Sequence, residues 1–250
     1  KQLYDPKPFW DEKARRAGKD FEAAVCLDDP NRNKNIDRIQ KRLLRKAFRQ
    51  LIQRTDLTGK KILDYGCGTG RWVDFFRNYG LDYTGVDLST EMVRIASERF
   101  SDATFDCLGP EGINYPPSAF DVVCSIAVIH HIPYEEQSAT ISELNRILKS
   151  RGFLILFESI NSPDPNNQLE FPKTEKDWNI TLSNHGFIQL WIENTTYFST
   201  RIILNRIVGK NRFRALSSKI SPSIDHWIGG LLPKRLQTRV AMVFQKINEK

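Results

Sequence analysis

The sequence predicts an α/β fold in which helices cover both faces of a doubly wound, mainly parallel β-sheet. Three observations carry this prediction. From residue 61 onward, short apolar runs alternate with segments of helical periodicity. A glycine-rich turn follows the first apolar run, and an acidic residue stands at or near the end of each of the first two. The 250 residues suffice for one such domain with a substantial core and an appendage.

Residues 1–57 are expected to form a cap that precedes the sheet. Residues 1–34 are polar and are interpreted as irregular. From 36 to 52, apolar residues recur at helical spacing, and the opposite face is almost entirely Arg, Lys and Gln. This pattern predicts a helix with one packed and one solvated face. The aromatic side chains before it are candidates for core or for a lid: Tyr4, Phe9, Trp10 and Phe21.

The central part, residues 58–160, shows the strand–turn–helix alternation most clearly. Strands are predicted at 61–65, 82–88, 103–108, 120–128 and 153–159, and helices at 71–79, 90–99 and 135–148. Ser89, directly before the second of these helices, is a favourable N-cap residue. Such alternation predicts parallel strands joined by right-handed crossovers, with a ligand bound at the carboxyl ends of the strands.

Residues 161–195 are expected to add one helix and one strand. The helix is predicted at 174–184, and GFIQLWIEN predicts a strand directly after it. The last segment, 239–250, contains AMVFQKI, which predicts a final strand at an antiparallel edge of the sheet.

Residues 196–238 are too many for a plain loop in a compact domain, so a helical insertion with structure of its own is predicted before the last strand. Arg and Lys alternate there with apolar residues. The segment can be a packed cap with a solvated basic face. The alternatives are a lid for an anionic acceptor, contact with an anionic membrane surface, and contact with RNA phosphates.

Composition favours a cytoplasmic protein without a bound metal. The net charge of +7 is moderate, and neither a membrane span nor a signal peptide is evident. The four cysteines lack metal-ligand spacing and are expected to be reduced, buried thiols: Cys26, Cys67, Cys107 and Cys124.

The stretch ILDYGCGTGRW combines an acid with three alternating glycines. Gly66, Gly68 and Gly70 permit a sharp bend and let a ligand lie against the backbone. A phosphate is disfavoured because Asp64 would repel it, so a positively charged group is expected there. Asp87 ends the second strand about twenty residues later, where an acid binds ribose hydroxyls in sheets of this type. An adenosine that carries an amino acid satisfies both demands.

Four landmarks in order, LDYGCGTG, GVDLSTEM, FDVVCSIAVIHHIP and SELNRILKSRGFLILFE, resemble class I S-adenosylmethionine-dependent methyltransferases, in particular small-molecule members of the type 11 and 12 groups. The resemblance covers residues 59–159. It implies a single Rossmann-like domain with a seven-stranded sheet and an antiparallel last strand. It also implies a transferase that uses S-adenosyl-L-methionine and releases S-adenosyl-L-homocysteine.

The resemblance also assigns roles to residues. Asp64 is expected to hold the methionine ammonium, and Asp87 the ribose. The backbone of the turn lies beneath the cofactor at Gly66, Cys67, Gly68 and Gly70. Leu88 and Met92 flank the adenine or ribose, although Met92 can equally be a core methionine. The end of the fourth strand, Ser125, Ile126 and Ala127, faces the methionine moiety.

The third strand departs from the family pattern, because the position of its usual acid beside adenine is occupied by Gly109. That contact is therefore absent or shifted to Asp106 or Glu111. The adenine is then expected to rely on Leu108 and on backbone amides.

His130 and His131 follow the fourth strand, where the methyl donor is expected. Either can be a general base that removes a proton from the acceptor. The alternative is a structural hydrogen bond between the strand end and the next helix.

The cofactor carboxylate also needs a cation, because Asp64 serves only the ammonium. Arg38, in NIDRI, is the first candidate, and Arg71 is the one cation nearby in the core.

The leading hypothesis is methyl transfer to an oxygen or nitrogen atom of a small metabolite, a sugar or a lipid-linked intermediate. One alternative is a tRNA methyltransferase, because SIAVIHHI is similar to enzymes that methylate a wobble-uridine side chain. A further alternative is a regulatory protein that binds the cofactor without turnover.

Overall fold

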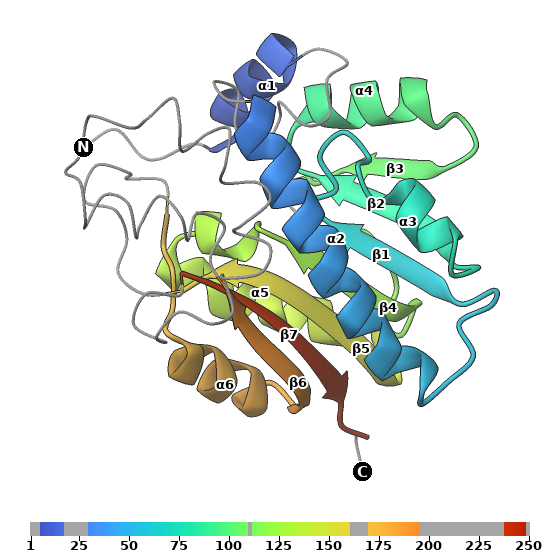
Figure 1. Ribbon diagram of the computed structural model, residues 1–250, viewed down its shortest axis with the longest axis vertical. Helices are drawn as coiled ribbons and strands as arrows, with labels where there is room; N and C mark the ends of the chain where they lie inside the picture. Colours follow the sequence, from blue (N-terminus) through green and yellow to red (C-terminus); the bar gives the residue numbers. More distant parts are fainter. Residues whose placement is uncertain (1–5, 18–29, 110–111, 161–169, 196–237, 249–250) are drawn as a thin grey trace.

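The computed structural model describes residues 6–17, 30–109, 112–160, 170–195 and 238–248, and they form one seven-stranded sheet with helices on both faces (Figure 1). The strand order is β3-β2-β1-β4-β5-β7-β6. Strand β7 runs antiparallel to both of its neighbours, and the pairs β1–β2, β2–β3, β1–β4 and β4–β5 are parallel. The predicted sheet with an antiparallel last strand is confirmed.

Most predicted elements lie within two residues of their expected bounds, but β5 begins five residues before its predicted start and α2 begins six residues before its own. The strands are β1 (Lys61–Tyr65), β2 (Asp82–Asp87), β3 (Thr104–Cys107), β4 (Phe120–Ile126), β5 (Leu148–Ser159), β6 (Phe187–Thr195) and β7 (Arg239–Lys246). The helices are α1 (Pro6–Ala17), α2 (Pro30–Ile52), α3 (Val73–Arg77), α4 (Thr90–Arg99), α5 (Tyr134–Ile147) and α6 (Glu175–Asn184), with a 3-10 turn, η1, at Ile129–His131. Helix α4 matches its prediction because Ser89 caps it, accepting a hydrogen bond from the Met92 amide at 3.1 Å.

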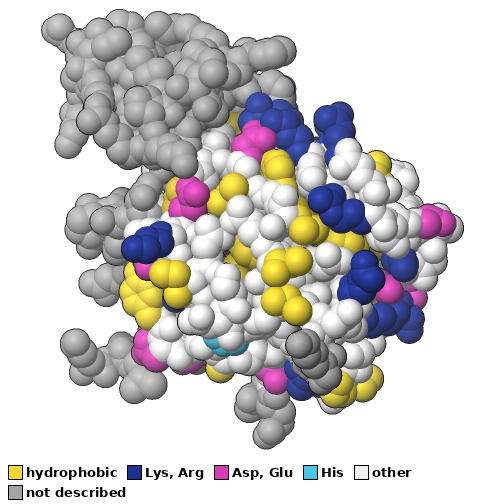
Figure 2. All heavy atoms as spheres, turned by 90° about the horizontal axis from the view of Figure 1, so that it is seen from below, with side chains coloured by type: hydrophobic (Ala, Val, Ile, Leu, Met, Phe, Trp, Pro, Cys, Tyr) yellow, Lys and Arg dark blue, Asp and Glu magenta, His cyan; other side chains and the backbone are white. Residues whose placement is uncertain are grey.

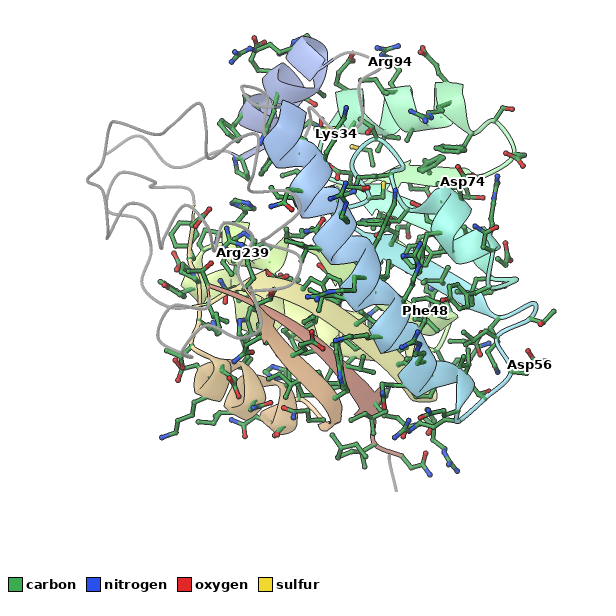
Figure 3. The ribbon with its side chains drawn as sticks, viewed as in Figure 1. Lys34, Phe48, Asp56, Asp74, Arg94 and Arg239 are labelled. Atoms are coloured by element: carbon green, nitrogen blue, oxygen red, sulfur yellow. The ribbon has the colours of Figure 1, made fainter. Side chains whose placement is uncertain are left out.

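Two apolar layers hold the helices to the sheet. On one face α2 and α3 pack on alternate strand residues, and Phe48 of α2 (Figure 3) packs against Phe76 of α3 within that layer. On the other face α5 and α6 pack through residues such as Leu144 and Trp178. The sheet is therefore buried on both sides, as a parallel sheet requires.

The interpretation of residues 1–34 as irregular is wrong where the structure describes them, because α1 and the start of α2 are helical. Helix α1 docks on α4. Trp10 and Ala14 pack against Met92 and Ile95, and Asp11 accepts hydrogen bonds from Ser89 Oγ at 2.5 Å and from the Glu91 amide at 3.1 Å. These tertiary contacts stabilise a helix whose own sequence is mostly polar. Of the remaining early aromatics, Phe9 is 41% exposed, and Tyr4 and Phe21 lie outside the described residues.

The expectation that the last strand lies at the sheet edge is wrong, because β7 lies between β5 and β6, and β6 is the edge. The side chains of β7 explain this position. Val240 and Met242 are buried on one face, while Ala241 and Val243 are buried on the other. A strand that is apolar on both faces belongs in the interior of a sheet. The predicted insertion at 196–238, except Thr238, lies outside the described residues.

Two further expectations concern cysteines and membrane contact. Cys67 and Cys124 are buried free thiols, but Cys107 is exposed because it ends the short edge strand β3. Cys26 lies outside the described residues. Among the helices that the structure describes, none has the length and hydropathy needed to cross a bilayer. On the face shown in Figure 2, hydrophobic side chains form small separate groups between Lys, Arg, Asp and Glu.

Candidate functional site

The three glycines of the turn after β1 all have backbone conformations that favour glycine, with φ of 77° at Gly66, 56° at Gly68 and 78° at Gly70. A Cβ at Gly66 would lie 2.2 Å from Val128 Cγ2, and one at Gly70 would touch the Phe100 ring at 3.1 Å. Close packing therefore requires these two glycines. A Cβ at Gly68 would meet nothing within 4 Å. The turn is thus packed on two sides and open at Gly68, where a ligand can lie on the backbone.

Asp64 lies buried near the end of β1, beside this turn. The hydroxyl of Tyr83, on β2, donates a hydrogen bond to Asp64 Oδ2 at 3.0 Å. Burial raises the pKa of the Asp64 carboxyl to about 7, although the Tyr83 hydrogen bond and the charge of Arg71 act in the opposite direction. A buried acid that is this costly to ionise fits a site that receives a cationic group.

Asp87 ends β2 and connects the turn to the start of α4. Its Oδ2 accepts a hydrogen bond from the Gly68 amide at 2.8 Å, and its Oδ1 accepts one from the Ser89 amide at 2.9 Å. Burial raises its pKa, and these amides oppose that effect. Since β1 and β2 are parallel neighbours, Asp64 and Asp87 lie at the same edge of the sheet. The two acids and the open backbone at Gly68 are compatible with an adenosine that carries an amino acid.

The predicted adenine side lies beyond Asp87. Leu88 and Leu108 are half-buried, and the Leu108 amide donates to the Asp87 carbonyl at 2.8 Å. Gly109 is exposed. Met92 is buried in the contact between α1 and α4, which favours the core interpretation of this residue.

The two acids considered for the adenine differ in their placement. Asp106 is exposed and accepts a hydrogen bond from the Tyr115 hydroxyl. Glu111 lies outside the described residues.

The end of β4 carries the residues predicted to face the methionine moiety. Ser125 and Ile126 are buried, and Ser125 Oγ has no hydrogen-bond partner in the described part of the chain. Ala127 has a φ of 61°, and its amide donates to the Phe157 carbonyl at 2.7 Å. A non-glycine residue in this conformation marks a tightly determined turn. The chain therefore leaves the sheet abruptly at this point.

His130 and His131 follow in η1 and have different surroundings. His130 is buried, and its Nδ1 lies 2.5 Å from Glu158 Oε2. Glu158 also accepts from the amides of Ile129 at 3.1 Å and His130 at 3.0 Å. Burial lowers the pKa of His130 to about 3 and raises that of Glu158 to about 7. His131 is half-buried, and the Trp10 ring packs edge-on against it at 5.1 Å.

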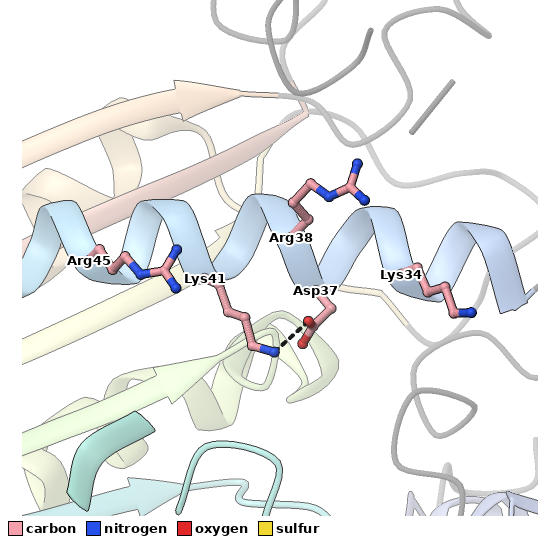
Figure 4. A pocket seen from close by; sticks show the side chains of 5 residues that line it. All are labelled: Lys34, Asp37, Arg38, Lys41 and Arg45. Atoms are coloured by element: carbon pink, nitrogen blue, oxygen red, sulfur yellow. Dashed lines mark ion pairs between the residues drawn. The ribbon is translucent and has the colours of Figure 1, made fainter. Parts of the chain in front are cut away.

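The two candidates for the cofactor carboxylate are Arg38, which belongs to α2, and Arg71, which follows the glycine turn. Arg38 lies on the exposed side of α2, and Arg71 contacts the other side. Arg38 is exposed and lines a shallow hollow of about 370 Å³ with Lys34, Asp37, Lys41 and Arg45. Figure 4 shows that it points away from Asp37 and Lys41.

Arg71 is 14% exposed and lies under α2. It donates to Gln40 Oε1, and its Nε is 3.9 Å from Asp37 Oδ1. Its guanidinium carbon is 4.2 Å from the centre of the Trp72 ring. The charge of Arg71 also opposes the rise that burial causes in the pKa of Asp64. Of the two candidates, Arg71 is therefore the one whose charge reaches Asp64.

Sequence reasoning missed three groups at this edge. Glu158 stands at the end of the apolar strand β5, the same signal that identified Asp64 and Asp87. Tyr83 and the pair Gln40–Asp37 are recognisable only once β2 and α2 are placed beside β1. Within the described segments, no cluster of three His, Cys, Asp or Glu side chains could hold a metal ion.

Comparison with known proteins defines the class of protein. A family model described as a methyltransferase domain matches residues 36–196. The chain belongs to this family, and the predicted methyltransferase class is confirmed. S-adenosylmethionine is accordingly its cofactor, which the fit of Asp64, Gly68 and Asp87 supports.

Individual relatives are more distant. A ubiquinone biosynthesis O-methyltransferase of Idiomarina loihiensis is 26% identical over 152 residues, which cover 59% of this chain and 57% of that protein. A tRNA (carboxymethyluridine(34)-5-O)-methyltransferase of Xenopus tropicalis is 35% identical over 102 residues, covering 40% of this chain but 15% of that protein. The chain thus spans just over half of the first relative's length and much less of the second's.

A solved structure of a Haemonchus contortus phosphoethanolamine N-methyltransferase, in complex with phosphomonomethylethanolamine and S-adenosylhomocysteine, has a TM-score of 0.65. It is 20% identical, and the match covers 98% of this chain and 61% of that one. This likeness shows the fold.

Proposed function

We propose that this chain transfers the methyl group of S-adenosylmethionine to an oxygen or nitrogen atom of a small metabolite, a sugar or a lipid-linked intermediate. The observation that carries this proposal is the pair Asp64 and Asp87, which flank the open backbone of Gly68 at one edge of the sheet. The methyltransferase relatives act on acceptors of several kinds, and the Idiomarina relative is named for O-methylation in ubiquinone biosynthesis.

The cofactor supplies a methyl group that is already activated by the sulfonium, so the chain has to position two molecules and exclude water. Asp64 would bind the ammonium, Arg71 the carboxylate and Asp87 the ribose. Gln40 and Asp37 hold Arg71 in place from α2. Helix α1 covers the site from α4 to His131 through Asp11 and Trp10.

The two histidines are proposed to have separate roles. The lowered pKa and buried contacts of His130 make it a positioning residue, which fixes η1 through Glu158. His131 remains as the candidate base, because it is less buried and lies on the side of α1. A general base of this kind contributes about 10²–10⁴-fold to a rate.

A transfer assay would decide among the functions. Purified protein is supplied with methyl-labelled S-adenosylmethionine and either a metabolite and lipid extract or bulk tRNA. The proposal predicts label in small molecules and none in tRNA. Label in tRNA alone would establish the wobble-uridine alternative, which the comparisons do not favour. Tight cofactor binding without transfer to either pool would instead indicate the regulatory alternative.

A further inference from the structure

Three polar side chains lie side by side where β5, β7 and β6 meet the active edge of the sheet. Arg239 of β7 is in register with Ser159 of β5 on one side and with Thr195 of β6 on the other. Residues directly opposite each other on neighbouring strands point to the same face. This is the face that α2 covers, because Phe157 and Ala241, each two residues away, belong to the layer beneath α2.

The two hydroxyl groups of this trio are buried without a hydrogen bond. Ser159 and Thr195 are each 1% exposed. Neither Ser159 Oγ nor Thr195 Oγ1 has a partner in the described part of the chain. A buried polar group without a partner destabilises the fold, so each such group needs an explanation, and a bound ligand is one. Two of them flanking one arginine indicate a ligand that accepts hydrogen bonds.

The charge at this position is positive and close to the proposed site of methyl transfer. Arg239 is half-buried at the start of β7 (Figure 3), and its Nη1 donates to the Thr238 carbonyl at 3.0 Å. Its charge lowers the pKa of His130, and the charge of Glu170 acts in the opposite direction. Arg239 therefore lies within electrostatic reach of the histidine that follows β4.

Helix α2 adds cations along the same side. Lys46 Nζ is 2.7 Å from Glu193 of β6, and Arg42 is 3.8 Å from the same carboxylate. Arg38 stands one helical turn before Arg42 on that stripe of α2. Figure 4 shows it on the side of the helix opposite Asp37. Since Thr195 follows Glu193 by two residues along β6, the positive stripe continues toward the trio.

We propose that Arg239, Ser159 and Thr195 form a subsite that binds the anionic group, a carboxylate or a phosphate, of the methyl acceptor. This inference rests on the proposed function. A guanidinium and two hydroxyl donors on one face match the oxygens of such a group. Strands β4 and β5 are parallel neighbours, so the subsite lies at the same sheet edge as Ser125. An acceptor anchored at Arg239 would present another atom toward the methyl group.

Anion binding to protein saturated with S-adenosylhomocysteine tests the subsite without turnover. Inorganic phosphate is followed by ³¹P NMR and ¹³C-labelled acetate by ¹³C NMR. Wild-type protein is expected to bind at least one of them saturably, with a Kd in the millimolar range. The anion that binds more tightly identifies the acidic group of the acceptor. Absence of saturable binding of both overturns the subsite.

Variants assign the binding to these residues. Arg239→Gln is expected to weaken anion binding at least tenfold, and the double change Ser159→Ala with Thr195→Val several-fold. Arg54→Gln is the control for loss of one positive charge, because Arg54 is exposed and lies in the turn that follows the C-terminal end of α2. Unchanged binding in the double variant overturns the proposal, and that variant keeps the test decisive if Arg239→Gln fails to fold.

Calorimetry with S-adenosylhomocysteine separates this proposal from the function on which it rests. Affinity for that ligand is expected to be unchanged in the double variant and in the control. If wild-type protein binds S-adenosylhomocysteine but neither anion, the subsite proposal is overturned and the proposed methyltransferase function stands. A wild-type protein that does not bind S-adenosylhomocysteine would overturn both.

Discussion

Trp10 on α1 packs edge-on against His131 of η1, with the ring centroids 5.1 Å apart. The next residue, Asp11, binds the first turn of α4 through Ser89 and Glu91. One short helix thus touches both ends of the proposed site, the ribose end beside Asp87 and the end where transfer takes place. Helix α1 is therefore expected to hold the cofactor in place.

Asp11→Ala should loosen α1 and speed cofactor release. The change removes two hydrogen bonds, which together contribute about 1–2 kcal/mol, so amide exchange in residues 6–17 should accelerate about tenfold. Hydrogen exchange and stopped-flow release of S-adenosylhomocysteine measure the two effects. Glu12→Ala is the control, because Glu12 is exposed and pairs with Arg15 on the same helix. Equal exchange and release in both variants would show that Asp11 does not fasten α1.

Arg71→Gln should weaken S-adenosylmethionine binding at least tenfold, because it removes the proposed partner of the cofactor carboxylate. Arg38→Gln should leave that affinity unchanged, since Arg38 lies on the exposed side of α2. The decarboxylated cofactor is the matched ligand, and Arg71→Gln should not weaken its binding. If only Arg38→Gln weakens S-adenosylmethionine binding, Arg38 and not Arg71 binds the cofactor carboxylate.

Cofactor affinity should depend on pH through Asp64. Its pKa of about 7 in the ligand-free chain means that the acid must lose a proton before it can pair with the ammonium. Affinity should fall up to tenfold per pH unit below pH 7 and level off above it. Calorimetry from pH 5.5 to 8.5 would show this slope in wild-type protein and a flatter profile in Asp64→Asn. A wild-type profile without a slope would contradict the assignment.

The stability of the ligand-free chain should also depend on the protonation of Asp64, but it should fall, not rise, as the pH increases. The folded chain keeps a proton on Asp64 that the unfolded chain releases above its ordinary pKa of 3.8. The contribution of Asp64 to the free energy of unfolding therefore falls as the pH rises from about 4 to about 7. Urea melts of wild type and Asp64→Asn at several pH values isolate this contribution.

The two histidines should separate stability from catalysis. His130→Ala leaves the buried Glu158 carboxyl without its imidazole hydrogen bond and should cost about 1–3 kcal/mol of stability. His131→Ala removes the proposed base, so it should keep the fold and the cofactor affinity but lower kcat about a hundredfold. Urea melts and transfer rates measure these effects. A His131→Ala enzyme with the wild-type kcat would show that the acceptor needs no base.

Local sequence patterns were enough to predict the elements on the cofactor-binding side of the sheet. The glycine turn, Asp64 and Asp87 are close together along two consecutive strands, so their placement needs only the parallel register of β1 and β2. Helix α4 was predicted to the residue because Ser89 marks its start.

Features that depend on distant partners were not predicted. Helix α1 is polar and is stabilised by α4, some eighty residues later. The choice between Arg38 and Arg71 depends on how α2 lies on the turn, since Gln40 and Asp37 hold Arg71 there. The position of β7 between β5 and β6 was readable in part, because AMVF is apolar on both faces, but which strands it joins depends on long-range pairing.

Binding of S-adenosylmethionine to Asp87→Ala tests the central claim most directly. The change removes the two charge-assisted hydrogen bonds proposed to the ribose, each worth about 1.5–3 kcal/mol, and also the acceptor of the Gly68 and Ser89 amides. Calorimetry should therefore show at least a tenfold loss of affinity. Asp74→Ala, which removes an exposed acid from α3, should bind as the wild type does. Equal affinities in wild type and Asp87→Ala would contradict the cofactor site described for this chain.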